Sequence, residues 1–237
     1  VAVAETFTVP TESGAWIINN SWGPPDGNPA VIESPAPFEP LADVVDQAIV
    51  DTVSNGRSGK GTLVLFAAGN GNEDVASDAF VSHPDTIGVA AVNARGVKSS
   101  YSDFGTSVWV AAPSDGNHLM PGIVTSDAMG DFGYNGANMP DNIDPNGDVT
   151  PSFGGTSSAT PAVSGVIGLM LSVNPQLTAG QVKDILRRTS RKIDKANGNY
   201  APDFDGFLRS PFYGYGLVDA HAAVRAAAIG CQADSLG

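Results

Sequence analysis

The hydrophobic positions of the chain form short continuous runs separated by longer amphipathic segments. Four runs, at 15–21, 62–68, 86–92 and 107–112, have the length of strands. Runs that are apolar at nearly every position are typical of parallel strands covered on both faces. The pattern therefore predicts a sheet built from these four segments.

Between and after these runs, apolar residues recur at helical spacing. Predicted helices cover 41–55, 156–173, 179–189 and 220–229, with Gly56 ending the first of them. On the first helix the expected buried face comprises Leu41, Val44, Val45, Ala48 and Ile49. Strands alternating with helices predict an α/β fold with a doubly wound, mostly parallel sheet flanked by helices.

Two segments of this pattern have particular consequences. Residues 156–173 are small and apolar on nearly every face, so we expect that helix in the middle of the protein. Residues 113–153 are rich in Gly, Asn, Asp and Pro and are interpreted as a long loop region. Loops of that length inside a compact domain are usually functional or disordered.

Composition excludes several classes of protein. A chain of 237 residues that is 42% hydrophobic fits one domain, and a net charge of −13 argues against binding nucleic acid or anionic lipid. The most apolar stretch, 162–173, is interrupted by Ser and Gly and is too short to span a membrane. The single cysteine, Cys231, allows no internal disulfide and does not indicate a redox compartment.

The segment Phe153-Gly-Gly-Thr-Ser-Ser-Ala-Thr-Pro161 places a serine, Ser157, at the start of an apolar helix. There, backbone N–H groups and the positive end of the helix dipole would stabilise an anion formed beside its hydroxyl. From the segment alone, Thr156 or Ser157 could equally be a helix cap. Catalysis and capping therefore both stay open at this point.

A resemblance to the subtilisin-like serine proteases, the subtilases, favours catalysis. The segment Gly155-Thr-Ser-Ser-Ala-Thr-Pro161 resembles their nucleophile signature, Gly-Thr-Ser-x-Ala-x-Pro, at every fixed position. Four further matches occur in the family's order, at 20–23, 67–71, 101–105 and 213–219. The resemblance implies that Ser157 is the nucleophile and that Asn70, with the Ser157 N–H, stabilises the oxyanion.

The same resemblance implies how substrate and metal bind. Ser21, Trp22 and Gly23 match the strand that pairs with an extended peptide substrate, and Gly69 and Gly155 are further expected substrate-binding residues. Gly154 and Gly155 permit the close backbone approach that such a substrate needs. The segments 21–27, 66–71 and 122–127 are similar to the kexin and proprotein-convertase branch. That branch implies a structural Ca²⁺ site at Asp26, at either Glu73 or Asp74, and at Asp103. It also aligns Asp78 with an acid that binds basic substrate side chains.

The resemblance fails at the other two members of a catalytic triad. A serine nucleophile needs a His general base and an Asp that orients it, and none of His83, His118 or His221 lies in a His-Gly-Thr motif. We therefore interpret residues 1–237 as the C-terminal, nucleophile-bearing portion of one subtilisin-like catalytic domain, N-terminally incomplete. An upstream fragment carrying Asp and His, on a cleaved or separate chain, is the expected partner, because this portion alone would expose apolar surface.

These features predict a serine endopeptidase that favours basic residues before the scissile bond. The alternative is a catalytically silent subtilase-like module that binds peptides or partners. The sequence Gly-Gly-Thr-Ser-Ser-Ala is not Gly-x-Ser-x-Gly, which excludes the nucleophile elbow of α/β-hydrolases. The resemblance and the acidic surface together imply an extracellular or periplasmic location.

Overall fold

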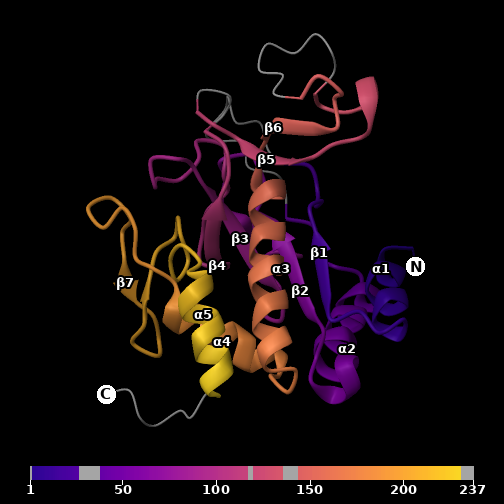
Figure 1. Ribbon diagram of the computed structural model, residues 1–237. Coiled ribbons are helices and arrows are strands. Elements are labelled where there is room, and N and C mark those ends of the chain that lie inside the picture. The colour runs from indigo at the N-terminus through magenta and orange to yellow at the C-terminus, as the bar shows by residue number, and fades with distance from the viewer. Residues whose placement is uncertain (1, 27–37, 117–119, 136–143, 231–237) are drawn as a thin grey trace.

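The centre of the protein is a four-stranded parallel sheet. The computed structural model describes residues 2–26, 38–116, 120–135 and 144–230. The strands lie in the order β1 (Ile17–Asn20), β2 (Leu63–Ala67), β3 (Ile87–Val92) and β4 (Val108–Pro113), as Figure 1 shows. All three neighbouring pairs are parallel. The four apolar runs are thus confirmed as strands, each within one or two residues of its expected bounds.

Helices cover both faces of this sheet. Successive side chains of β2 point to opposite faces of the sheet. Leu63 and Leu65 belong to the core cluster on one face, and Val64 and Phe66 to the cluster on the other. One face is covered by α1 (Ala2–Glu12) and α2 (Asp43–Gly59), and the other by α3 (Thr156–Val173), α4 (Ala179–Thr189) and α5 (Ala220–Ile229). This arrangement confirms the predicted α/β fold with a mostly parallel sheet flanked by helices.

The helix α3 has the predicted bounds but not the predicted burial. It contacts all four strands, and Ala159, Val163, Ile167 and Met170 are fully buried against them. The opposite side is exposed, with Leu169 at 55% and Val173 at 47% of their full surface. The expectation that α3 lies in the middle of the protein is therefore wrong for this side. Within the described ranges, α3 alone is long and apolar enough to cross a membrane, yet half of it is buried as a core helix.

The helix α2 ends as predicted and departs from expectation near its start. Regular helix stops at the predicted glycine, since Gly56 has φ −56° and ψ 159° and the next two residues have positive φ. At the start, Val44 is 52% exposed, so its place on the predicted buried face is wrong. Val45, Ala48 and Ile49 do form that face.

Several elements had no clear sequence signal. The helix α1 contains three threonines and Pro10 and was not predicted. The region interpreted as a loop, 113–153, contains an antiparallel pair of strands that extends beyond the start of α3 (Figure 1). The remaining short elements are η1 (Val75–Ser77), β5 (Ile123–Ser126), η2 (Gly130–Phe132), β6 (Val149–Phe153), β7 (Ala201–Pro202) and β8 (Leu208–Arg209).

Candidate active site

The candidate site is a small pocket beyond the carboxyl ends of β1 and β2, where the start of α3 meets them. It has a volume of about 80 Å³. Open parallel sheets place ligands at this edge because loops from several strands converge there. The pocket is lined by Ser21, Trp22, Gly23, Pro24, Asp26, Ala67, Gly69, Asn70, Asp78, Thr156 and Ser157.

Ser157 is the second residue of α3 and is partly exposed. The N-cap position of the helix is Gly155, with φ 74°, and the helix has no side-chain cap there. The hydroxyl of Thr156 bonds instead to the neighbouring β2 loop, so capping does not account for these two hydroxyl residues. On the outer side, the Ser21 hydroxyl donates to the Ser157 carbonyl at 3.2 Å, which joins the β1 loop to the start of α3.

Asn70 follows β2 and is oriented by Thr156. The Asn70 side-chain Oδ1 accepts hydrogen bonds from Thr156 N at 2.9 Å and from Thr156 Oγ1 at 3.1 Å. Because the carboxamide oxygen is engaged in this way, the NH₂ group is the part of Asn70 that is left to donate. From the sequence, Thr156 was named only as a candidate helix cap, although it occupies a fixed position of the nucleophile signature.

Trp22 forms one wall of the pocket and is anchored by aromatic rings from three elements. Its ring lies 6.5 Å from Phe7 of α1, 5.4 Å from Phe66 of β2 and 5.2 Å from Phe80, centroid to centroid. Two of these pairs are edge-on, the favourable geometry for aromatic contacts. The segment after β1 is therefore held firmly beside Ser157.

Three carboxylates gather directly behind the Asn70 loop. Oxygen atoms of Asp26, Glu73 and Asp103 lie within 4.8 Å of one another. Asp26 accepts from Asn70 N at 3.1 Å, so this acidic cluster is joined to the residue that faces Ser157. Burial, with the nearby charges of Asp26 and Glu73, raises the pKa of Asp103 to about 7. Carboxylates brought this close favour either proton uptake or a bound cation.

Gly69 packs against the acidic cluster, and Asp74 lies outside it. A side chain at Gly69, which has φ 110°, would place its Cβ 2.1 Å from Asp103 Oδ2, so only glycine fits. Asp74 is exposed, and its carboxylate accepts from Ala76 N at 2.9 Å, capping η1. Of the two alternatives left open by the sequence, Glu73 joins Asp26 and Asp103 and Asp74 does not.

Asp78 lies at the other side of the pocket. Its Oδ1 accepts from Phe80 N at 2.7 Å and from Val81 N at 3.2 Å, while Oδ2 lies 3.1 Å from where a Cβ on Gly23 would be. Burial raises its pKa, and the negative charges of Asp26 and Glu73 contribute in the same direction. The pocket therefore presents an acid to whatever enters beside Gly23.

The two described histidines lie outside the pocket. His83 is buried, accepts from Asp85 N through Nδ1, and has its Nε2 3.4 Å from Asp46 of α2. His221 is on α5. Neither lines the pocket around Ser157, and His118 is outside the described residues.

Comparison with known proteins places this arrangement in a family. The chain is 46% identical over 229 residues to a calcium-dependent protease of Trichormus variabilis, across 94% of this chain and 34% of that protein. It is 30% identical over 211 residues to proprotein convertase subtilisin/kexin type 6 of Homo sapiens, across 88% of this chain and 19% of that protein. It thus spans about a third or less of the length of these two relatives.

Solved structures show the same fold. The crystal structure of a serine protease of Aeromonas sobria superposes with a TM-score of 0.79 at 24% identity, across 91% of this chain and 44% of that one. The family model described as the subtilase family matches residues 2–216. This chain therefore belongs to the subtilase family.

Proposed function

We propose that this chain carries the nucleophile of a serine endopeptidase. The observation that carries the proposal is the meeting of Ser157 and Asn70 in one pocket, with the Asn70 carboxamide oxygen held by Thr156. That hold leaves a side-chain NH₂ group and the start of α3 beside the Ser157 hydroxyl. The arrangement suits acyl transfer from a peptide bond, in which negative charge develops on the carbonyl oxygen.

In this reaction the Ser157 hydroxyl loses its proton to a base and attacks the carbonyl carbon of the substrate. The resulting oxyanion accepts hydrogen bonds from the Ser157 backbone N–H and from Asn70 Nδ2. Collapse of the tetrahedral intermediate expels the amine, which takes up the proton, and leaves an acyl group on Ser157. Water then hydrolyses the acyl-enzyme by the same steps in reverse.

Substrate would bind as an extended peptide beside the segment that follows β1. Ser21, Trp22 and Gly23 line the pocket together with Gly69. Main-chain hydrogen bonds along such a segment give affinity without demanding a particular sequence. Gly155, with φ 74°, leaves the approach to Ser157 free of a side chain.

The general base and the acid that orients it are proposed to come from outside residues 1–237, on an upstream segment of the chain or on a separate one. Two surfaces support this assignment. In the described sheet β1 is an edge strand, and Trp16, Gly168, Leu171 and Pro175 line an apolar hollow of about 370 Å³ beside it. An open edge next to apolar surface is suited to another strand and helix.

A bound Ca²⁺ is proposed at the acidic cluster of Asp26, Glu73 and Asp103. Three converging carboxylates are the hard oxygen ligands that Ca²⁺ prefers. Burial, with the nearby charges of Asp26 and Glu73, raises the pKa of Asp103 to about 7, and a bound cation would offset these effects. The ion would also fix the loop that carries Asn70. The name of the Trichormus variabilis relative supports a role for calcium.

A preference for basic side chains follows from Asp78. Its carboxylate lies in the same pocket as Ser157 and would pair with Lys or Arg before the scissile bond. The similarity to a proprotein convertase supports this preference. The name of an extracellular serine protease of Aeromonas sobria supports a location outside the cytoplasm.

Peptide hydrolysis tests the proposed function. The full-length protein with Ca²⁺ should cleave a fluorogenic peptide with Arg before the scissile bond, and Ser157→Ala should reduce turnover by about 10⁶-fold. Ser126→Ala, an exposed serine of β5, is the matched control and should keep full activity. A Ser157→Ala variant as active as the unmodified protein would overturn the proposal.

A further inference from the structure

A buried carboxylate that the proposed reaction does not use lies behind the start of α3. Asp115 follows β4 and is 5% exposed. Its Oδ1 accepts from Gly155 N at 3.2 Å and from the Tyr101 hydroxyl at 2.5 Å, and its backbone carbonyl accepts from Ser99 Oγ at 2.6 Å. Burying a carboxylate is costly, so its position at this point calls for an explanation.

The carbonyl of the same glycine is held from the other side. Ser114 Oγ donates to Gly155 O at 2.8 Å, and Ser158 donates to the same oxygen through both Oγ and N at 3.1 Å. Two adjacent residues after β4 thus hold both polar groups of Gly155. The backbone that leads into the nucleophile is fixed to the core of the sheet.

The Asp115 carboxylate also leaves no room for a side chain at Gly154. A Cβ on Gly154 would lie 2.4 Å from both Cγ and Oδ1 of Asp115, which no side chain could tolerate without displacing the acid. The two glycines that precede Ser157 are therefore packed directly on Asp115. Burial and the bond to Asp115 raise the pKa of Tyr101 to about 12, so its hydroxyl stays a donor throughout the neutral range.

At the start of α3, successive backbone N–H groups donate to different side chains. Gly155 N donates to Asp115 and Thr156 N donates to Asn70, and the next amide along the chain is that of Ser157. We propose that Asp115 is a positioning residue for the nucleophile, which sets the Gly155 peptide so that Ser157 Oγ and the Ser157 N–H face one substrate carbonyl. This proposal rests on the function proposed above and deepens it.

Replacement of Asp115 by Asn tests the assignment while keeping the side chain's size. The amide has one acceptor where the carboxylate has two, and it holds a backbone N–H less strongly than an anion does. In the full-length protein with Ca²⁺, we expect Asp115→Asn to lower kcat per titrated active site by about 10- to 100-fold with KM within about twofold. The rate of Ser157 labelling by a fluorophosphonate should fall in parallel.

The matched control is Asp219→Ala, which removes the N-cap of α5, a bond from Ala222 N at 2.9 Å. This variant should have a lower Tm and an unchanged kcat per titrated site. Such a result would show that a loss of stability alone does not lower kcat. Unchanged or increased kcat in a folded Asp115→Asn variant, with the unmodified protein labelled at Ser157, would overturn this proposal alone. An unmodified protein that is never labelled would overturn the proposed function and this proposal with it.

Discussion

At the scale of single residues, the proposed oxyanion role of Asn70 depends on how its side chain is held. Its carboxamide oxygen accepts two hydrogen bonds from Thr156, so the amide hydrogens are the donors available to a substrate. We predict that Asn70→Ala lowers kcat by about 100- to 1,000-fold, because one oxyanion donor is lost. Stopped assays with a fluorogenic peptide measure the change.

Asn197→Ala is the control for this substitution, because Asn197 is exposed and its side chain donates to Asp194 in a remote loop. Its kcat should match that of the unmodified protein. An Asn70→Ala variant within about threefold of normal kcat would contradict the oxyanion role.

A second pair of residues tests which acids hold the metal. Glu73 joins Asp26 and Asp103, whereas Asp74 caps η1. Glu73→Gln should weaken Ca²⁺ binding by about 10- to 100-fold, because the site loses one charge. Asp74→Asn should leave the affinity unchanged, since Asn caps a helix as well as Asp does. Isothermal titration of the metal-free protein distinguishes the two, and the reverse order would contradict the assignment.

At the scale of elements, apolar runs predicted the strands well because a buried parallel strand leaves a continuous hydrophobic signal. The run 62–68 and the strand Leu63–Ala67 differ by one residue at each end. Helix α1 could not be predicted in this way, because its buried side shows only Ala4 and Phe7 and its sequence includes Pro10. No residue of β5 is buried and only Thr150 of β6 is, so neither strand has the continuous apolar run of a buried parallel strand.

The nucleophile and the acidic cluster were found through motifs, whereas Asp115 was not. Motifs mark residues that touch substrate or metal, and these are the roles that we propose for Ser157, Asn70 and Asp103. Asp115 acts through contacts made across the fold, with Gly155 forty positions away in the chain. The sequence feature that could have identified Asp115 is a charged residue directly after a buried strand, at the same edge of the sheet as Asn70.

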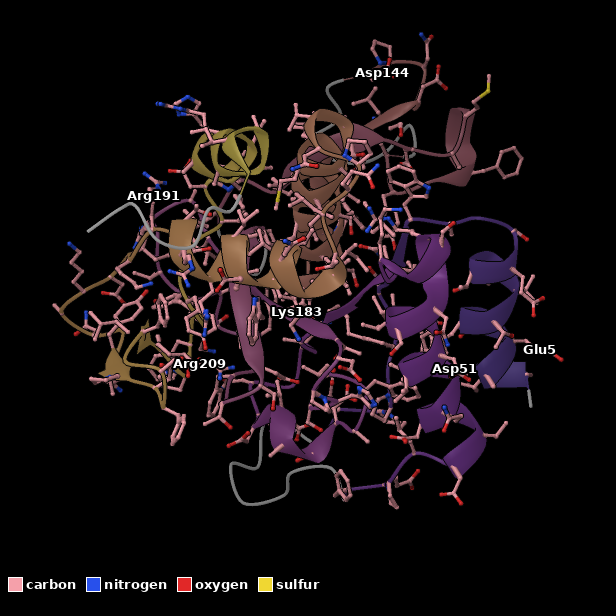
Figure 2. All side chains as sticks on the ribbon, turned by 90° about the horizontal axis from the view of Figure 1, so that it is seen from below. Glu5, Asp51, Asp144, Lys183, Arg191 and Arg209 are labelled. Carbon is pink, nitrogen blue, oxygen red and sulfur yellow. The ribbon has the colours of Figure 1, made fainter. Side chains whose placement is uncertain are left out.

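The environment of Lys183, where α4 packs against the sheet, predicts how stability changes with pH. Lys183 belongs to α4 (Figure 2). Its Nζ donates to the carbonyls of Pro84 at 2.7 Å and Thr86 at 2.9 Å, and lies 4.4 Å from the centre of the Trp109 ring. Burial lowers its pKa to about 8. Between pH 8 and pH 10 the folded state therefore binds fewer protons at this site than the unfolded state, and its contribution to stability rises with pH.

We predict that this contribution to the free energy of unfolding rises by about 1 kcal/mol per pH unit over that range. Urea unfolding of the unmodified protein and of Lys183→Met, with the difference plotted against pH, measures it. The difference should favour the unmodified protein increasingly as pH rises. A difference independent of pH would show that Lys183 keeps an ordinary pKa.

At the scale of the whole molecule, apolar surface is exposed along one side of the part of the chain that the structure describes. The edge of β1 and the exposed side of α3, with Leu169 and Val173, lie where the proposed upstream segment would pack. We predict that residues 1–237 expressed alone self-associate and bind a hydrophobic dye, whereas the full-length protein does neither. Light scattering and dye fluorescence measure both properties.

Leu169→Glu gives this prediction a matched test. It should reduce self-association of the isolated polypeptide, because a charge replaces exposed apolar surface, yet lower the activity of the full-length protein by disturbing docking. A monomeric 1–237 polypeptide that unfolds cooperatively and binds no dye would contradict the proposed docking surface.

The most direct test of Ser157 as the nucleophile is mass spectrometry of the full-length protein after reaction with a fluorophosphonate in Ca²⁺. We predict one adduct per molecule, mapped to the peptide that contains Ser157, and its absence in the Ser157→Ala variant. A fully folded, calcium-loaded protein with no adduct at Ser157 would contradict the assignment of this residue as the nucleophile.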